Sequence, residues 1–323
     1  MKGFPLLIYA ITPVYVGMGR SSGIVDLPIQ RDPLGFPIIF SSSFKGALKQ
    51  WCGTKSDNSK DKSNKYDKYG RLNCNDQEIK NCCCLFGGES IGSDENAEAN
   101  NEKKQVQETA SIISLSDFYP LVIPVPSLDK GYVYLTSKYL IDTLFELFSS
   151  VEYENGKNWI NQFNKNNNPN GSVTIGSDME GIPYLKFQDS NFEKEITNLG
   201  KLAERLKDGI AYETDDLKAV FEIEKGIIKY TRNKINLENG TVSDNALWTE
   251  EYLPRGTILA GIVFFNVPRK NKYCENGEII DENKAESKFK EVFGEKEFYL
   301  NVGGKETIGR GLVKVKVLYT DKR

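Results

Sequence analysis

The side chains available for chemistry in this chain are carboxylates, tyrosines, lysines and cysteines, because its 323 residues include no histidine. Histidine is the only side chain whose unperturbed pKa lies near neutrality. Its absence excludes a Ser-His-Asp triad, a Cys-His pair, an HExxH zinc site and a histidine general base. Any catalysis must use carboxylates, Lys, Tyr, Cys or a metal ion held mostly by oxygen ligands.

Asp26 is the first candidate for such chemistry. It is flanked by apolar residues in a segment that follows the Gly- and Ser-rich loop 17–23 and that also carries Arg20 and Arg31. An aspartate there is able to hold a divalent cation, or to position a 2′-hydroxyl or water for in-line attack on a phosphodiester. The alternative, which is commoner for a lone aspartate, is a turn or capping role.

A second candidate is the segment 245–254, which contains Trp248, Glu250, Glu251 and Tyr252. The two aromatic side chains are able to stack on nucleic-acid bases, and either glutamate could assist an acid–base step. The alternative is that the aromatic residues belong to the core and the acidic residues face solvent.

Positive charge is concentrated in three segments, although the whole chain has a net charge of −3. Residues 1–51 hold five basic and two acidic residues, residues 303–323 hold six and two, and residues 225–237 hold four basic residues and no acidic one. Such segments suit a protein that binds a phosphate backbone. The overall acidity argues against a uniformly basic nucleic-acid binder, and charged runs are also typical of solvated faces.

The loop 303–311 lies in the last of these segments. Its glycines allow backbone N–H groups to approach phosphates, and Lys305 and Arg310 add positive charge. It lacks the Gly-Lys-Ser/Thr of a Walker loop, so a plain glycine-rich turn remains the alternative.

Six cysteines are present, three of them adjacent. Neighbouring cysteines are not expected to reach separate bridging partners, so this spacing favours reduced thiols in a cytoplasmic protein over a disulfide framework. A structural zinc site is the alternative, with ligands drawn from Cys52, Cys74, Cys82, Cys83 and Cys84.

These candidates must be positioned by a mixture of strands and helices. A helix is expected to begin at Phe44, capped by the hydroxyl groups of residues 41–43. Amphipathic helices are predicted around Leu140 to Val151, Ile196 to Leu206 and Phe289 to Phe293. Strands are expected at 6–11, 227–237, 240–252, 257–267 and 312–318.

Two features of this pattern determine the expected architecture. Asn239-Gly240 joins two of the strands into a hairpin, and no βαβ rhythm is sustained, which favours a single α+β domain over residues 1–323. Residues 53–108 are expected to form polar, mobile surface insertions. No stretch is apolar for long enough to span a membrane.

Several motifs occur together in a fixed order: VDLPIQR at 25–31, SSSFKGAL at 41–48, LFG at 85–87, GTV at 240–242 continued by ALWTEEYLP at 246–254, and IGRG at 308–311. This order resembles the RAMP superfamily, and most closely the repeated backbone subunit of the Cmr (type III-B) CRISPR effector complex. The resemblance covers most of the chain apart from the polar insertions.

The resemblance implies a ferredoxin-like, RRM-related palm with a thumb-like β-hairpin at 225–254, stacked in several copies along a guide RNA beside other subunits. It implies cleavage of complementary target RNA at regular intervals with a divalent cation, Mg²⁺ or Mn²⁺. Asp26 falls on the family's catalytic and metal-holding aspartate, and Glu250 and Tyr252 fall near the cut site. The residues expected to bind RNA are Arg20, Ser41, Ser42, Ser43, Lys45, Lys49, Arg232, Trp248, Gly309 and Arg310.

Two alternatives to this function stay open at this point. The chain could be a purely structural guide-RNA binder in which Asp26 shapes a loop. It could also be the corresponding backbone subunit of the type III-A complex.

Overall fold

The computed structural model describes residues 2–21, 23–55, 72–74, 76, 79–91, 106–165, 171–175, 181–186, 190–238, 240–274, 277, 279–294 and 297–319. The predicted insertions at 53–108 fall largely outside the described residues. The chain divides into two compact units. The first contains Met1–Gly3, Lys45–Leu115 and Val263–Lys296, and the second contains Phe4–Phe44, Ser116–Ile262 and Glu297–Arg323.

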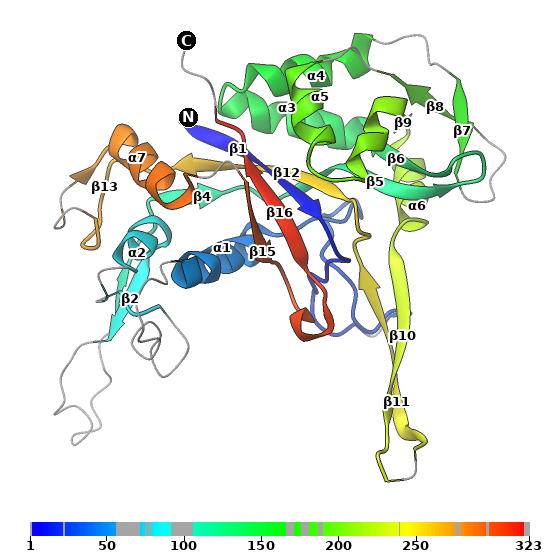
Figure 1. The fold of residues 1–323 in the computed structure, drawn as a ribbon, viewed down its shortest axis with the longest axis horizontal. Helices are drawn as coiled ribbons and strands as arrows, with labels where there is room; N and C mark the ends of the chain where they lie inside the picture. Colours follow the sequence, from blue (N-terminus) through cyan, green and yellow to red (C-terminus); the bar gives the residue numbers. More distant parts are fainter. Residues whose placement is uncertain are drawn as a thin grey trace. The chain divides into compact units, whose positions relative to one another are not determined.

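The second unit is built on one mixed sheet (Figure 1). Its strands are β1 (Gly3–Ala10), β5 (Tyr119–Ser127), β6 (Gly131–Ser137), β7 (Ser172–Thr174), β8 (Gly181–Leu185), β9 (Ile210–Glu213), β12 (Ile258–Phe265), β15 (Glu297–Asn301) and β16 (Leu312–Val317). They lie in the order β15-β16-β1-β12-β5-β6-β9-β8-β7. Strands β6 and β9 are parallel, whereas β1 and β16 are antiparallel with Ile8 opposite Val315. The predicted mixed α+β architecture is confirmed.

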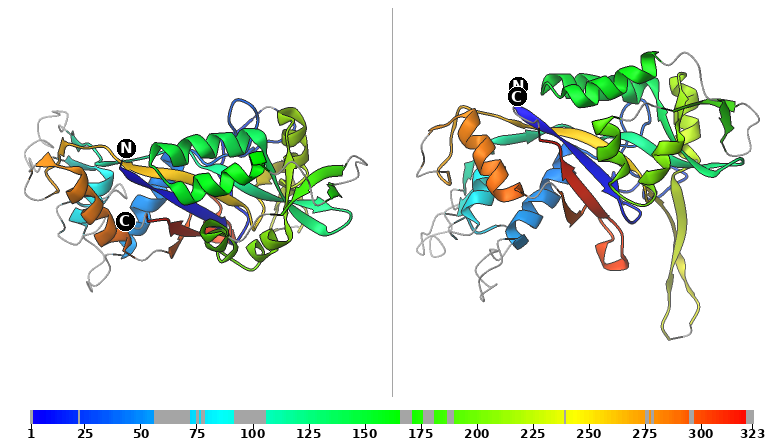
Figure 2. Two further views of the ribbon diagram at one scale, coloured as in Figure 1. Left: turned by 90° about the horizontal axis from the view of Figure 1, so that it is seen from above. Right: turned by 45° about the horizontal axis from the view of Figure 1, so that its top comes forward.

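Helices α3 (Lys138–Ser150) and α4 (Glu154–Lys165) pack together beside this sheet (Figure 2). The Ser137 hydroxyl group caps α3 by accepting a hydrogen bond from the Leu140 N–H group at 3.3 Å. Leu140, Leu144 and Phe148 recur at helical spacing and are fully buried. The α3 helix predicted from their periodicity is therefore present.

The single helix predicted through Ile196 and Leu206 is wrong. Helix α5 (Asn191–Thr197) ends before Gly200, and a separate 3-10 helix covers Ala203–Asp208. A Cβ atom at Gly200 would lie 2.4 Å from the Tyr9 ring, so the chain at this glycine packs tightly against β1. This contact separates the two helical turns although their apolar spacing is continuous.

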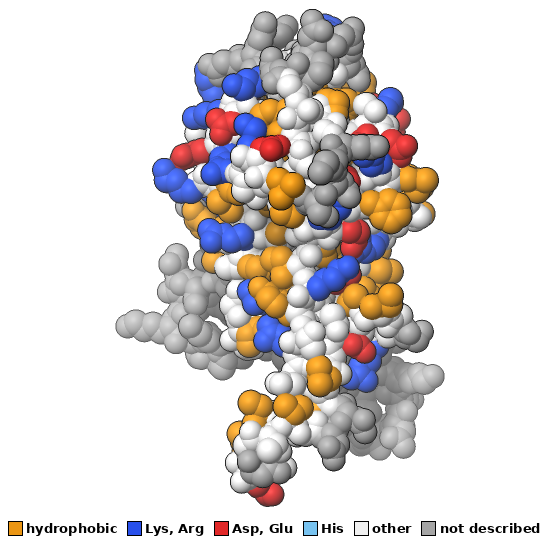
Figure 3. All heavy atoms as spheres, turned by 90° about the vertical axis from the view of Figure 1, so that its right-hand side faces the viewer, with side chains coloured by type: hydrophobic (Ala, Val, Ile, Leu, Met, Phe, Trp, Pro, Cys, Tyr) orange, Lys and Arg blue, Asp and Glu red, His pale blue; other side chains and the backbone are white. Residues whose placement is uncertain are grey.

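Strands β10 (Ile228–Ile235) and β11 (Val242–Tyr252) form a long antiparallel hairpin that extends from the sheet of the second unit (Figures 1 and 2). Tyr230 lies opposite Glu250 and Arg232 lies opposite Trp248. Orange hydrophobic side chains are visible along the hairpin in Figure 3. Those exposed towards its tip are Ile235, Leu237, Val242 and Leu247.

The first unit contains mainly helices and short strand pairs. Its elements are most of α1 (Ser41–Lys55), α2 (Lys80–Phe86), β2 (Gly88–Ile91), β3 (Val106–Thr109), β4 (Ile113–Leu115), β13 (Arg269–Lys270), β14 (Ile279–Ile280) and α7 (Glu282–Phe293). Trp51 of α1 stacks on Phe293 of α7 with their ring centroids 5.4 Å apart. Helix α7, predicted from Phe289, Val292 and Phe293, is present. No helix within the described residues is long and apolar enough to cross a membrane.

Six cysteines form three disulfides in the first unit, so the prediction of free thiols is wrong. The pairs are Cys52–Cys82, Cys74–Cys83 and Cys84–Cys274. Adjacent cysteines reach different partners because successive residues of α2 point about 100° apart around the helix axis. Every candidate zinc ligand is bonded to another sulfur, which also removes the zinc alternative.

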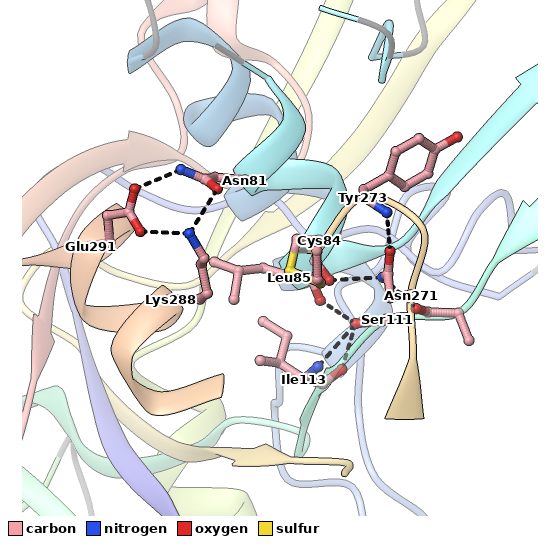
Figure 4. The surroundings of a disulfide bond; sticks show 11 residues. Asn81, Cys84, Leu85, Ser111, Ile113, Asn271, Tyr273, Lys288 and Glu291 are labelled. Carbon is pink, nitrogen blue, oxygen red and sulfur yellow. Dashed lines mark hydrogen bonds and ion pairs between the residues drawn. A yellow bond between two sulfur atoms is a disulfide. The ribbon is translucent and has the colours of Figure 1, made fainter. Parts of the chain in front are cut away.

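The third disulfide is surrounded by hydrogen bonds from a fully buried asparagine (Figure 4). The Asn271 amide donates to the carbonyl oxygens of Cys84, at 3.1 Å, and Ala110, at 3.0 Å. Its side-chain oxygen accepts from the Tyr273 N–H group at 2.8 Å. These contacts fix the segment that carries Cys274 beside α2.

Candidate active site

Asp26 lies in a loop that is held against the edge of β11. The Thr249 N–H group donates to Asp26 Oδ2 at 2.8 Å, across a separation of 223 residues. The next residue of the loop, Leu27, donates to the Thr249 carbonyl at 3.0 Å and accepts from the Glu251 N–H group at 3.1 Å. The hairpin base therefore fixes the orientation of the Asp26 carboxylate, while the side chain stays half-buried rather than enclosed.

A buried ion pair anchors the far end of this loop. Glu251 is 4% exposed, and its Oε2 atom accepts from the Ile29 N–H group at 3.3 Å and from Arg31 Nη2 at 3.1 Å. The Arg31 guanidinium also forms an ion pair with Glu224 and donates to the Gly35 carbonyl at 3.1 Å. Arg31 thus connects the Asp26 loop to both the hairpin and the end of α6 (Asp216–Glu224).

Replacing Arg31 by Met should disturb whatever reaction Asp26 supports without removing a group at the reaction centre. Displacing a catalytic group by about 1 Å is able to lower the reaction rate about 100-fold, so we expect the rate of R31M to be lower by about 10-fold or more. The measurement is the rate of the RNA cleavage that the family resemblance implies, at saturating RNA, together with RNA affinity. R205M is the matched control, because Arg205 instead donates to the Lys130 carbonyl and stacks on Tyr132. Equal rates for R31M and R205M would contradict this role.

Glu250 is the centre of a second cluster at the hairpin base. Its side chain is 0% exposed. Its carboxylate accepts from Trp248 Nε1 at 2.7 Å, from Lys305 Nζ at 2.7 Å, from Arg232 Nε at 3.0 Å and from the Tyr252 hydroxyl group. Burial alone would raise the pKa of Glu250, but the hydrogen bonds from Lys305, Tyr252 and Trp248 outweigh it and lower the pKa to about 2. Glu250 is therefore ionised at neutral pH, with its lone pairs occupied by these donors.

Three tyrosines and three cations make up the cluster around this carboxylate. The ring centroid of Tyr252 lies 5.7 Å from that of Tyr15 and 5.6 Å from that of Tyr230. The Arg310 guanidinium lies 5.2 Å from the Tyr252 ring and 5.3 Å from the Tyr230 ring. Burial and the neighbouring Glu250 raise the pKa of Tyr252, so its hydroxyl group keeps its proton at neutral pH.

The glycine-rich loop packs against the backbone that follows β1. A Cβ atom at Gly303, where φ is +81°, would lie 1.9 Å from the Tyr15 carbonyl oxygen, and one at Gly311 would lie 2.4 Å from the Val302 carbonyl oxygen. Only glycine fits at these two positions. In contrast, Gly309 is exposed and has open space beside it.

The family model described as the RAMP superfamily matches residues 7–314, which covers both compact units. The chain belongs to the RAMP superfamily. The resemblance inferred from the ordered motifs is confirmed.

Two curated relatives of this RAMP protein match over almost their whole length. The "CRISPR system Cmr endoribonuclease Cmr4" of Pyrococcus furiosus is 27% identical, and the match covers 98% of this chain and 95% of the relative. The "CRISPR system CMR subunit Cmr4" of Saccharolobus solfataricus is 26% identical, with 97% and 96% covered.

Solved structures share the RAMP fold of this chain. A chain of the type III-B Cmr-beta complex bound to cognate target RNA has a TM-score of 0.68 at 21% identity, with 98% of this chain and 97% of that chain covered. Oligomeric Cmr4 from Pyrococcus furiosus has a TM-score of 0.57 at 21% identity, with 99% and 100% covered.

Not all the predicted site residues of this RAMP protein lie at the hairpin base. Those that do are Asp26, Arg232 of β10, and Trp248, Glu250 and Tyr252 of β11, with Gly309 and Arg310 in the glycine-rich loop beside them. Arg20 is exposed in the loop that leads to Asp26. Lys45 and Lys49 lie in the first unit, where Arg269 is near them. Burial, and then the positive charges of Lys49 and Arg269, lower the pKa of Lys45.

The serines form the first turn of α1, which begins three residues earlier than predicted. The Asp117 carboxylate, 76 residues away, accepts from the Ser41 N–H group at 2.7 Å and so performs the capping assigned to the serines. The Ser43 hydroxyl group accepts from the Gln30 amide at 2.9 Å, and Ser42 is exposed. Gln30 therefore links the Asp26 segment to the start of α1.

Sequence reasoning missed the residues that hold this site together. Gln30 and Arg31 both lie in the VDLPIQR motif. Their partners, Ser43 and Glu251, are 13 and 220 residues away in the sequence. Nothing in the sequence indicates a role for Tyr15, which follows the first predicted strand and belongs to none of the motifs. Arg269 was also missed, and only its proximity to Lys45 in the folded first unit connects it to the predicted lysines.

The described residues contain no cluster of three or more carboxylate or cysteine side chains able to hold a metal ion by themselves. Asp26 supplies one carboxylate, of which Oδ2 accepts from Thr249. Mg²⁺ is commonly bound through one or two carboxylates together with water and substrate phosphates. This donor set fits a cation that is held jointly by Asp26 and RNA.

Proposed function

We propose that this protein is the guide-RNA-binding backbone subunit of a type III-B CRISPR effector complex, and that it cleaves complementary target RNA at regular intervals in a divalent-metal-dependent reaction. The observation that carries the proposal is the attachment of Asp26 to the β11 edge, beside the buried cluster around Glu250. The names of the two Cmr4 relatives support it. In this role the subunit stacks with further copies of itself and with other subunits in the cytoplasm.

The charges around Glu250 suit a phosphodiester substrate. Lys305 balances the negative charge of Glu250, so Arg232 and Arg310 leave the cluster with surplus positive charge. The surplus positive charge attracts the RNA backbone and stabilises the charge that develops as the phosphodiester is cleaved. Asp26 aligns the attacking hydroxyl group and holds the cation, and a bound Mg²⁺ or Mn²⁺ would act as a Lewis acid on the phosphate.

Glu250 and Tyr252 take part in this proposal by positioning other groups. A glutamate with a pKa of about 2 carries no proton to donate at neutral pH, and its oxygens already accept four hydrogen bonds. Tyr252 keeps its own proton bonded to Glu250 and presents its ring to Arg310. Both residues therefore hold the cations and the aromatic rings in place beside Asp26.

The remaining predicted residues hold RNA without reading its sequence. Phosphate contacts position a nucleic acid, and base pairing between guide and target supplies the sequence choice. In this assignment the guide phosphates contact Arg20, Ser41, Ser42, Ser43, Lys45, Lys49, Arg232, Gly309 and Arg310, and Trp248 stacks on a base.

The β10–β11 hairpin acts as a thumb on a ferredoxin-like palm in this proposal. Its exposed Leu237, Val242 and Leu247 side chains supply an apolar wedge between bases. Unstacking one nucleotide bends the RNA backbone towards the geometry needed for in-line attack, at a cost of a few kcal/mol. Cuts would then be spaced by the distance between successive thumbs.

The second candidate is a structural guide-RNA-binding subunit that does not cut. It is favoured by the absence, among the described residues, of any group of three or more carboxylate or cysteine side chains able to hold a metal ion. In that case Asp26 would serve to attach its loop to Thr249, and a substitution there would affect assembly.

The test of the proposed function is cleavage of end-labelled RNA by the guide-loaded complex. Complementary RNA should yield evenly spaced products with Mg²⁺ or Mn²⁺ and none with EDTA, whereas non-complementary RNA stays intact. Complementary RNA that is bound but never cut would contradict the proposed function and favour the structural guide-RNA-binding subunit instead.

Neutralising a phosphate contact should reduce the salt dependence of guide binding. The Arg310 guanidinium lies 5.2 Å from the Tyr252 ring at the hairpin base, where the proposal assigns it to a guide phosphate. We expect R310M and K45M each to lower the slope of log K against log salt by about one or less. R205M is the control, and a slope identical to that of the wild type would remove the residue from the RNA-binding set.

A further inference from the structure

Lys305 has a backbone conformation that is uncommon for a lysine. Its φ is +68°, in the left-handed region that favours glycine, although glycines occupy neighbouring positions of the same loop. A side chain retained at such a position is a reason to look for a function. Its Nζ atom lies 2.7 Å from Glu250 Oε1 and 5.8 Å from the centroid of the Tyr15 ring.

The ion pair between Lys305 and Glu250 completes a closed set of contacts. The glycine-rich loop is bonded to the segment after β1 through Gly304 N–H and the Tyr15 carbonyl, at 2.9 Å. That segment pairs with the end of the hairpin, because Val14 and Leu253 exchange backbone hydrogen bonds at 3.0 and 2.9 Å. Lys305 then joins the loop directly to β11.

Glu250 lies between the two residues of β11 that hold the Asp26 loop. Thr249 donates to the Asp26 carboxylate, and the Glu251 N–H group donates to the Leu27 carbonyl. Removing the Lys305 ammonium would leave a fully buried carboxylate with one charged donor fewer. A buried charge that loses its partner is costly, so β11 is expected to shift until Glu250 finds another donor or water.

We propose that Lys305 is a positioning residue for target-RNA cleavage, which acts by holding Glu250 and thereby keeps β11 in the place that orients Asp26. The inference rests on the proposed function. Direct contact between Lys305 and an RNA phosphate is the competing explanation, since about a third of the lysine side chain is exposed.

The experiment compares guide-loaded complexes made with wild type, K305M, K305R and K314M. Single-turnover cleavage at saturating target separates the rate from target affinity. K305M should be about 10- to 100-fold slower, with target affinity unchanged within about twofold, because the change displaces Asp26 rather than removing an RNA contact. K305R should restore most of the rate, since arginine also pairs with carboxylates. K314M is the matched control, because Lys314 forms an ion pair with Glu297 between β15 and β16.

A double substitution distinguishes the two explanations. If Lys305 acts through Glu250, adding K305M to E250Q will cause no further loss of rate. The proposal would be overturned if the losses of rate caused by K305M and E250Q multiply in the double variant, or if K305M cleaves as fast as the wild type. It would also be overturned if target affinity falls in parallel with the rate. If K305M fails to assemble with guide RNA, K305Q replaces it, and a wild-type rate for K305Q would overturn the proposal equally.

Wild type and D26N on the same gel separate this proposal from the proposed function. No cuts by wild type would refute the nuclease function itself. Cuts by wild type and K305M at equal rates, lost only in D26N, would refute the role of Lys305 alone.

Discussion

Replacing Asp26 by Asn should abolish target-RNA cleavage, with a rate at least about 100-fold below that of the wild type. Asparagine keeps the size of the side chain, and its carbonyl oxygen is still able to accept the 2.8 Å hydrogen bond from Thr249. The loop therefore stays attached to β11, while the negative charge that holds a cation and aligns the attacking group is lost. The measurement is cleavage by the guide-loaded complex, with target affinity determined on the same preparation.

The control for D26N is D142N. Asp142 is a half-buried residue of α3 that forms an ion pair with Lys138, so its neutralisation should leave both cleavage and binding unchanged. A D26N complex that cuts as fast as D142N would remove Asp26 from the catalytic site. A D26N complex that loses target binding as well would instead assign the residue to assembly.

Reducing the three disulfides should destabilise the first unit more than any single substitution proposed above. A disulfide typically contributes about 2–4 kcal/mol to the free energy of unfolding. All six cysteines are buried, and they join α1, α2 and the segment before α7. Thermal unfolding followed with and without a phosphine reductant should show a transition at lower temperature in the reduced protein.

Thiol alkylation followed by mass spectrometry provides the control for this prediction. The protein denatured without reductant should take up no alkyl groups, and the reduced protein should take up six, matching its six cysteines. A paired C84S/C274S variant should keep the other two disulfides. Six reactive thiols in the protein denatured without reductant would contradict the pairing.

Local patterns in the sequence predicted the elements whose stability depends on neighbouring residues. The spacing of Leu140, Leu144 and Phe148 is enough to specify the buried face of α3, and the two strands predicted to form a hairpin pair as β10 and β11. The helix predicted across Gly200 was wrong because the packing of Tyr9 against that glycine is a long-range contact.

The cysteine prediction failed for a geometric reason. The prediction assumed that neighbouring cysteines cannot each reach a separate bridging partner, but on α2 the three adjacent residues point in different directions around the helix axis. Their partners lie on separate segments, at sequence separations of 30, 9 and 190 residues. No local pattern indicates which of these pairings occurs.

The candidate site was predictable in its residue types and not in their roles. Asp26, Glu250 and Tyr252 were identified as candidates from the sequence and from the family resemblance. The burial of Glu250, its four donors and its ion pair with Lys305 appear only when β11 and the glycine-rich loop are brought together. That environment changes the proposed role of Glu250 from acid–base chemistry to positioning.

In the proposed function, each subunit carries its own Asp26-dependent cleavage site. The most direct test is a guide-loaded complex assembled from a mixture of wild-type and D26N subunits, with the cut positions in labelled target RNA mapped at nucleotide resolution. Every regularly spaced cut should persist at a frequency equal to the wild-type fraction. Cuts that vanish together at a small D26N fraction, or that remain at full frequency with D26N alone, would contradict the claim.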